Sequence, residues 1–395
     1  MPKMILEKTE KISGILQEEG IDLWLTFVRE SSIGGDPIMP LIFGEQNLTW
    51  QSMLIFTRSG ESIAIVGNLE LDTAQNLGIY DHVIGYDKGI QENFLEVLQR
   101  INPGQIAINT SLSNVRADGL RHGMYQKLVK LLEDTPWRDR LCSAEGIIAK
   151  ITGRKTPTEV SLIRDAVKET EEIFQETYDF VKVGMTEKDV ADFMHQCLAE
   201  RGLEAAWDYE GCPIVNAGPD SPMGHALPGD RVINAGEILH LDFGVKKNGY
   251  CSDIQRVIYF LKDGEQKPPE AVQQAFDVIS MAERESTAKI RPGIIGKDID
   301  QIARDIVVEG GFPEFKHALG HQLGQFAHDG GSLLGPGWPK YGEKVTIPLE
   351  AGQVFTVEPS LLLPGYGIIG LEEDVLITED GADYLSTPQR NWILK

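Results

Sequence analysis

The sequence predicts two domains, an α/β domain with a mixed sheet followed by a pseudo-symmetric α+β domain. Its 395 residues exceed what one hydrophobic core usually supports. Over residues 1–154, strand-like runs alternate with helical runs, which is typical of an α/β domain. Over residues 155–395, two helices followed by a pair of strands occur twice, which indicates an internal duplication. We therefore expect a domain boundary after residue 154 and, beyond it, two hairpins that face each other.

In the N-terminal half, local patterns predict four helices and four strands. Helical runs lie at 5–19, 71–78, 90–101 and 117–134. Short apolar runs typical of buried strands lie at 21–28, 52–57, 61–67 and 105–109. This half contains no GxGxxG or P-loop sequence, so no nucleotide site is indicated.

In the C-terminal half, helix starts and stops are well marked. Thr156-Pro157-Thr158-Glu159 is a capping box with proline at the first helical position, and it opens a helix that runs to about residue 183. A second helix begins at Thr186 and stops at Gly202. Two more helices are predicted at 269–290 and 297–311, and further strands at 352–359 and 368–380.

Composition limits the kinds of partner. The formal net charge of −23 argues against nucleic-acid or anionic-membrane binding as the main role. The four cysteines show no CxxC spacing and are typical of reduced, buried thiols. The charged N-terminus lacks a signal-peptide core, and no apolar run approaches the ~20 residues that cross a bilayer. We expect a cytoplasmic protein.

The stretch from 236 to 260 predicts a hairpin with two carboxylates on one face. Asn248-Gly249 is a strong type I′ turn signal, and apolar residues fill both flanks. With that turn, Asp242 lies opposite Gln255, and Asp253 is a diagonal neighbour on the same face, roughly 7–8 Å away. Two buried carboxylates would repel each other, so a cation is expected between them. The alternative is that one aspartate caps a turn and the other is solvated.

Ligand-type residues also gather in the second half of this domain. Three histidines, His317, His321 and His328, lie within one glycine-rich segment. Glu358 ends an apolar strand, and either Glu372 or Glu373 interrupts another. Four carboxylates and one imidazole form a hard, oxygen-rich ligand set that suits a pair of Mn²⁺, Co²⁺, Fe²⁺ or Zn²⁺ ions. Such a pair lowers the pKa of a bridging water and stabilises a displacement at carbonyl or phosphorus.

The order of these motifs resembles the pita-bread metallopeptidases, which include prolidase, Xaa-Pro aminopeptidase and methionine aminopeptidase. The motifs are DFG, then GYCSD, HxxGHxxG with a later histidine, VEP and LEEDVLIT, over roughly 155–395. The N-terminal half, by its type and length, resembles the creatinase-like domain of the proline-specific members. The resemblance implies a metal site formed by Asp242, Asp253, His321, Glu358 and Glu372, with Asp253 and Glu372 bridging two ions. It also favours Glu372 over Glu373.

The resemblance implies further roles around the metals. His225, His317 and His328 would bind substrate, and His225 and His328 would stabilise the tetrahedral intermediate or move a proton. Glu358 would also act as a base for the bridging water. For His225, the alternative is a loop histidine with one backbone hydrogen bond. His240 is expected beside the metals, not on them.

Two positions depart from the pattern. Many proline-specific relatives carry Arg two residues before the last metal glutamate, where this chain has Gly370. A guanidinium there would hold a substrate carboxylate or fix a loop, and Tyr366 or Tyr384 could supply a compensating hydroxyl. Asp329 follows His328 where the family often has Glu.

The resemblance implies a binuclear hydrolase of Xaa-Pro bonds in short peptides, either an Xaa-Pro dipeptidase or an Xaa-Pro aminopeptidase. A metal-bridging hydroxide would attack the carbonyl before proline, with Mn²⁺ the first choice of metal and a homodimer the expected assembly. One alternative is a creatinase-like C–N hydrolase or lyase acting on a small molecule. Another is a non-catalytic pita-bread scaffold, although all five ligand positions are filled here.

Overall fold

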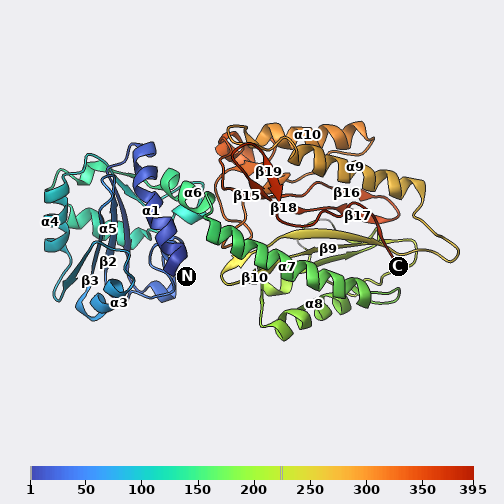
Figure 1. The fold of residues 1–395 in the computed structure, drawn as a ribbon, viewed down its shortest axis with the longest axis horizontal. Helices are drawn as coiled ribbons and strands as arrows, with labels where there is room; N and C mark the ends of the chain where they lie inside the picture. Colours follow the sequence, from blue (N-terminus) through green and yellow to red (C-terminus); the bar gives the residue numbers. More distant parts are fainter. Residues whose placement is uncertain (1, 223, 225) are drawn as a thin grey trace. The chain divides into compact units, whose positions relative to one another are not determined.

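The structure, a computed structural model, describes residues 2–222, 224 and 226–395 (Figure 1). Contacts divide the chain into two compact units, Met1–Thr152 and Gly153–Lys395. Each unit contains its own buried hydrophobic clusters, with two clusters in each. In the described part of the chain, no helix is long and apolar enough to cross a membrane.

Unit 1 is built on a six-stranded mixed sheet in the order β4-β3-β2-β1-β5-β6. The strands are β1 (Leu23–Val28), β2 (Ser52–Thr57), β3 (Ser62–Gly67), β4 (His82–Tyr86), β5 (Ile106–Ile108) and β6 (Leu141–Ser143). Strand β2 is antiparallel to both neighbours, and the other pairs are parallel. The four predicted strands are confirmed. Strands β4 and β6 escaped prediction because β4 is a half-exposed edge strand and β6 has three residues.

Helices cover both faces of this sheet (Figure 1). They are α1 (Pro2–Glu19), α2 (Met39–Ile42), α3 (Leu71–Asn76), α4 (Gln91–Ile101), α5 (His122–Leu131) and α6 (Glu145–Gly153). Alternate residues of β1 face opposite clusters, since Trp24 packs with α1 while Leu25 packs with α4 and α5. The helix predicted at 117–134 was too long at both ends. The helix begins only at His122, because Arg121 has a non-helical ψ of 143°, and it ends at Leu131.

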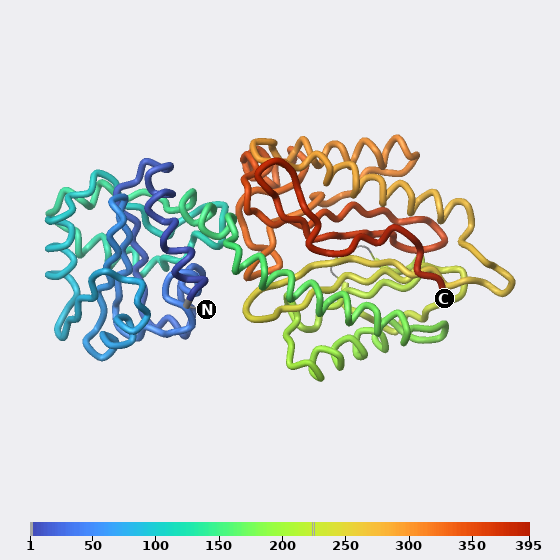
Figure 2. Tube along the Cα trace, viewed as in Figure 1, coloured from blue at the N-terminus to red at the C-terminus, as the bar shows by residue number. Residues whose placement is uncertain are grey.

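Unit 2 places two pairs of helices outside its strands (Figures 1 and 2). The helices are α7 (Pro157–Phe180), α8 (Glu187–Arg201), α9 (Glu270–Thr287) and α10 (Gly296–Glu309). The predicted capping box at Thr156 is formed, and the predicted helix start at Thr186 also forms a capping box. Gly202 ends α8 in the left-handed region at φ 63°. Helix α7 ends at Phe180, three residues before the predicted end, because Val181 is already extended.

The strands of unit 2 form several sheets between these helix pairs, and β20 from the second half joins the main sheet of the first half. One sheet has the order β20-β12-β9-β8, a second has the order β15-β18-β19, and β16 pairs with β17. Their bounds are β8 (Ile214–Ala217), β9 (Ile238–Phe243), β12 (Ile254–Tyr259), β15 (Val354–Val357), β16 (Ser360–Leu363), β17 (Gly367–Gly370), β18 (Glu373–Ile377), β19 (Ala382–Tyr384) and β20 (Ile393–Leu394). The predicted pseudo-symmetric α+β architecture is confirmed.

The first hairpin has the predicted register. Asn248 and Gly249 have φ of 52° and 81°, as a type I′ turn requires, and Lys247 pairs with Tyr250. Asp242 lies opposite Gln255. The ladder is interrupted at Gly244, where a Cβ would overlap the Ser252 carbonyl, so the hairpin splits into β9 and β12 near the site and β10 (Val245–Lys247) with β11 (Tyr250–Cys251) near the turn. Asp253 lies in the gap between β11 and β12.

Candidate metal centre

Five predicted ligands come from five different pieces of backbone in unit 2. Asp242 lies near the end of β9, and Asp253 lies between β11 and β12. The imidazole is that of His321, which ends the two-residue strand β13 (Gly320–His321). The remaining two are Glu358, directly after β15, and Glu372, directly before β18.

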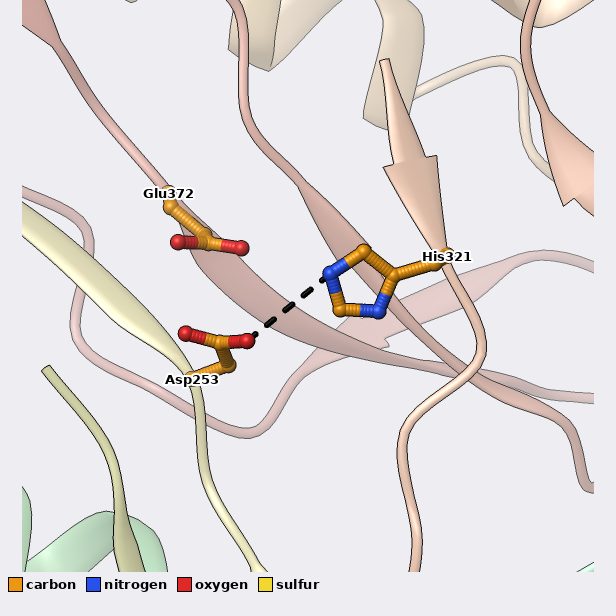
Figure 3. A group of neighbouring side chains, drawn as sticks. All are labelled: Asp253, His321 and Glu372. Atoms are coloured by element: carbon orange, nitrogen blue, oxygen red, sulfur yellow. Dashed lines mark ion pairs between the residues drawn. The ribbon is translucent and has the colours of Figure 1, made fainter. Parts of the chain in front are cut away.

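Ligand atoms of Asp253, His321 and Glu372 all lie within 4.8 Å of one another. Figure 3 shows these three side chains pointing toward a common centre. His321 Nε2 lies 3.7 Å from Asp253 Oδ2 and 3.5 Å from Glu358 Oε1. The charge of Asp242 acts on the carboxyl groups of Asp253, Glu358 and Glu372, which connects the fifth side chain to this group. Segments distant in the sequence therefore bring four carboxylates and one imidazole together.

Burial makes this cluster costly without a cation. Burial raises the pKa of Asp242 to about 7, and the pKa values of Asp253, Glu358 and Glu372 lie well above their ordinary range. For Asp253 and Glu372, the neighbouring carboxylates raise the pKa further. Asp242 Oδ1 and Glu372 Oε2 are buried and accept no hydrogen bond from the residues that the structure describes. Unsatisfied carboxylate oxygens facing one centre fit divalent metal ions, which prefer such hard ligands.

The neighbouring residue Glu373 has a structural partner that the sequence did not reveal. Arg256 on β12 binds it with two hydrogen bonds of 2.9 and 3.0 Å, and both side chains are buried. Ser386 and the backbone of Gln389 also donate to Glu373. This pair links β12 to β18 beneath the cluster and accounts for a charge inside an apolar strand. The sequence feature that could have predicted this pair is Arg256, a charged residue inside an apolar strand, three residues after Asp253.

Asp374, also beyond the predicted ligands, is fully buried beside the cluster. Its Oδ2 accepts a hydrogen bond from the backbone of Asp253, at 3.2 Å. Burial raises its pKa well above the ordinary range. Asp374 therefore helps to fix the backbone of Asp253.

The predicted substrate histidines are differently placed. The His328 ring stands edge-on to the His321 ring, with centroids 4.2 Å apart. His317 lies in hydrogen-bonding range of Ser360 Oγ, at 2.7 Å, and of the Ala318 carbonyl, at 2.8 Å. His225 lies outside the described residues. Thus His328 directly adjoins the cluster, and His317 adjoins β16.

Tyr384 and Tyr366, the two tyrosines considered as replacements for arginine, make contacts elsewhere in unit 2. The Tyr384 hydroxyl lies 2.6 Å from Glu283 and 3.2 Å from Arg390. Tyr366 packs against the cluster of apolar residues around α9. At Gly370 itself, a Cβ would overlap Gln255 and lie 2.7 Å from His240 Nε2. The structure therefore fills this space with side chains from β9 and β12.

Fold and cluster together define a two-domain hydrolase of the metallopeptidase type. A family model described as metallopeptidase family M24 matches residues 161–379, more than half of the chain. The chain belongs to this family and is a peptidase by class.

Individual relatives agree with this assignment. A protein of Staphylococcus saprophyticus, named as an uncharacterized peptidase, is 28% identical over 335 residues, which are 84% of this chain and 87% of that one. The fold is similar to that of an Xaa-Pro dipeptidase from Bacillus anthracis, with a TM-score of 0.75, 20% identity and coverage of 99% and 100%. It is also similar to an X-Pro aminopeptidase from Thermotoga maritima, with a TM-score of 0.71, 24% identity and coverage of 98% and 99%.

Proposed function

We propose that this protein hydrolyses Xaa-Pro peptide bonds in short peptides with two divalent metal ions. The observation that carries the proposal is the convergence of ligand atoms of Asp253, His321 and Glu372 within 4.8 Å, in a chain of the M24 family. Proline specificity is supported by similarity in fold to proteins named as Xaa-Pro dipeptidase and X-Pro aminopeptidase.

Metal binding would use the whole carboxylate set. Asp242, Asp253 and Glu372 would neutralise most of the positive charge, and His321 with Glu358 would complete the coordination. When bound, the ions supply Lewis acidity and lower the pKa of a coordinated water. Mn²⁺ is the first choice because an oxygen-rich set with one imidazole suits a hard dication.

The chain's own groups would move the protons. Glu358 Oε2 accepts a hydrogen bond from Gln255 at 3.2 Å, while Oε1 lies 3.5 Å from His321. Glu358 would accept the proton of the attacking water. His328, beside His321, would donate to the developing oxyanion or to the proline nitrogen that leaves. His225 and His317 would orient the peptide.

Other finer properties stay predictions from the sequence. They are the creatinase-like character of residues 1–154, the homodimer and the cytoplasmic location. A proline-specific site inside a dimer would limit access to short peptides.

The test is turnover by the purified full chain loaded with Mn²⁺ or Co²⁺. Ala-Pro and Ala-Pro-Ala should be cleaved, and Ala-Ala should not. Asp253→Asn should abolish turnover, and His328→Ala should reduce it roughly 10²-fold or more. Asp305→Asn is the control, because Asp305 is exposed on α10 and its carboxylate accepts a hydrogen bond from Gln301, one turn earlier on the same helix. No cleavage of either proline peptide with metal bound would contradict the proposal.

A further inference from the structure

Gln255 is buried at the junction of the two hairpins and bonds to both. Its side-chain Nε2 donates to Glu358 Oε2 at 3.2 Å, and its backbone carbonyl accepts from the Glu372 backbone at 3.3 Å. Its own strand pairs it with Asp242. One residue that is not itself a ligand type therefore contacts three of the five proposed ligands.

The amide of Gln255 is oriented from its other side. Gln255 Oε1 lies 2.9 Å from His240 Nε2, and His240 Nδ1 lies 3.0 Å from Asn216 Oδ1. All three side chains are buried. Gln255 Oε1 accepts from His240 Nε2, and Nδ1 of the neutral imidazole then carries no proton to donate to Asn216 Oδ1. The hydrogen-bonded chain therefore runs from His240 on β9 through Gln255 on β12 to Glu358.

The fold keeps a glycine next to this chain. A Cβ at Gly370, on β17, would overlap Gln255 Oε1 and lie 2.7 Å from His240 Nε2. The backbone at Gly370 has no positive φ, so the constraint is space and not conformation. The Gln255 amide and the His240 imidazole therefore occupy the space that a side chain at position 370 would need.

We propose that His240 and Gln255 act as a positioning relay that holds the Glu358 carboxylate in its metal-binding orientation, and that Gly370 is required to accommodate it. Glutamate has three rotatable side-chain bonds, and a buried carboxylate without a donor would turn toward another partner. A hydrogen bond to an ionised carboxylate is among the stronger ones in proteins, so the Gln255 amide selects one rotamer. The proposal rests on the metal site proposed above.

The direct test is the affinity of the metal-free full chain for Mn²⁺, measured by titration calorimetry. Gln255→Ala should weaken the tighter-held Mn²⁺ by roughly 10–100-fold, the usual effect of losing a partner of a metal ligand. Gln255→Met keeps the length and removes only the amide, so it should show the same loss if the alanine variant fails to fold. Loaded with Mn²⁺, either variant should lower kcat on Ala-Pro while KM changes little, because Glu358 and not the peptide is displaced.

A matched control separates positioning from general packing. Gln389 is also buried, and its side chain bonds only to the backbone of Val257 and Asn391. Gln389→Ala should lower the midpoint of thermal unfolding and leave Mn²⁺ affinity within about threefold of wild type. Equal Mn²⁺ affinity in wild type, Gln255→Ala and Gln255→Met would overturn the relay. A wild-type chain that binds no Mn²⁺ would instead overturn the metal site itself.

Coupling between Gly370 and Gln255 supplies a second readout. Gly370→Ala should weaken Mn²⁺ binding in the wild-type background and weaken it less in the Gln255→Ala background, where the nearer overlapping atom is gone. Gly337→Ala is the control, because a Cβ there meets no atom within 4 Å. If the effects of Gly370→Ala and Gln255→Ala on the free energy of Mn²⁺ binding are strictly additive, residue 370 and Gln255 do not compete for the same space.

Discussion

Among single residues, Asp242 illustrates how burial and charge act together at the proposed centre. Its pKa is raised to about 7 from an ordinary value of 3.8, chiefly by burial. Asp253, Glu358 and Glu372 are raised in the same direction. An acid whose pKa is higher in the folded state binds more protons there than in the unfolded chain. Stability is therefore lost as the pH rises from the unfolded pKa through the folded one.

This sign gives a prediction for the metal-free protein. Its midpoint of thermal unfolding should fall between about pH 5 and pH 7.5, since the folded carboxylates must ionise next to one another over that range. Saturating Mn²⁺ should reduce the fall, because bound cations stabilise the ionised forms. Differential scanning calorimetry at both pH values, with and without Mn²⁺, makes the comparison. An equal pH dependence in both forms would contradict it.

Among the elements, the start of α7 supports two parts of the centre. Its capping residue Glu159 accepts a hydrogen bond of 2.9 Å from the hydroxyl group of Tyr250. Tyr250 lies three residues before Asp253 in the first hairpin. Lys155, just before the helix, lies 2.9 Å from Asp329, which follows His328. Both side chains of this ion pair are almost fully buried, at 0% and 3% exposed. Helix α7 thus fixes the hairpin and the histidine segment relative to each other.

The ion pair at this helix start can be tested by Lys155→Met. The substitution leaves Asp329 buried without its cation, and we expect a loss of about 3–5 kcal/mol in the free energy of unfolding. Urea unfolding provides the measurement. Arg284→Met is the control, because the Arg284–Glu285 pair is 54% and 45% exposed, and it should change stability by less than about 0.5 kcal/mol. A loss no larger than that of the control would show that the pair does not hold the segment.

Across the whole molecule, the features predicted from sequence are those that local chemistry determines. The Asn248-Gly249 turn set the hairpin register, and the Thr156 and Thr186 capping boxes set two helix starts. What escaped prediction depends on partners far apart in the chain. The Arg256–Glu373 and Lys155–Asp329 pairs form only when segments more than 100 residues apart meet. The half-exposed edge strand β4 also escaped, because its residues lack the apolar alternation of a buried strand.

The most direct measurement of the proposed centre is a metal count on the reconstituted full chain. Metal-free protein is incubated with Mn²⁺, desalted and analysed by atomic emission, beside Asp253→Asn prepared in the same way. Wild type should retain about two Mn²⁺ per chain, and the variant, which loses a bridging carboxylate, about one or fewer. A wild-type count well below one, or one equal to that of the variant, would contradict a metal pair held by these five side chains.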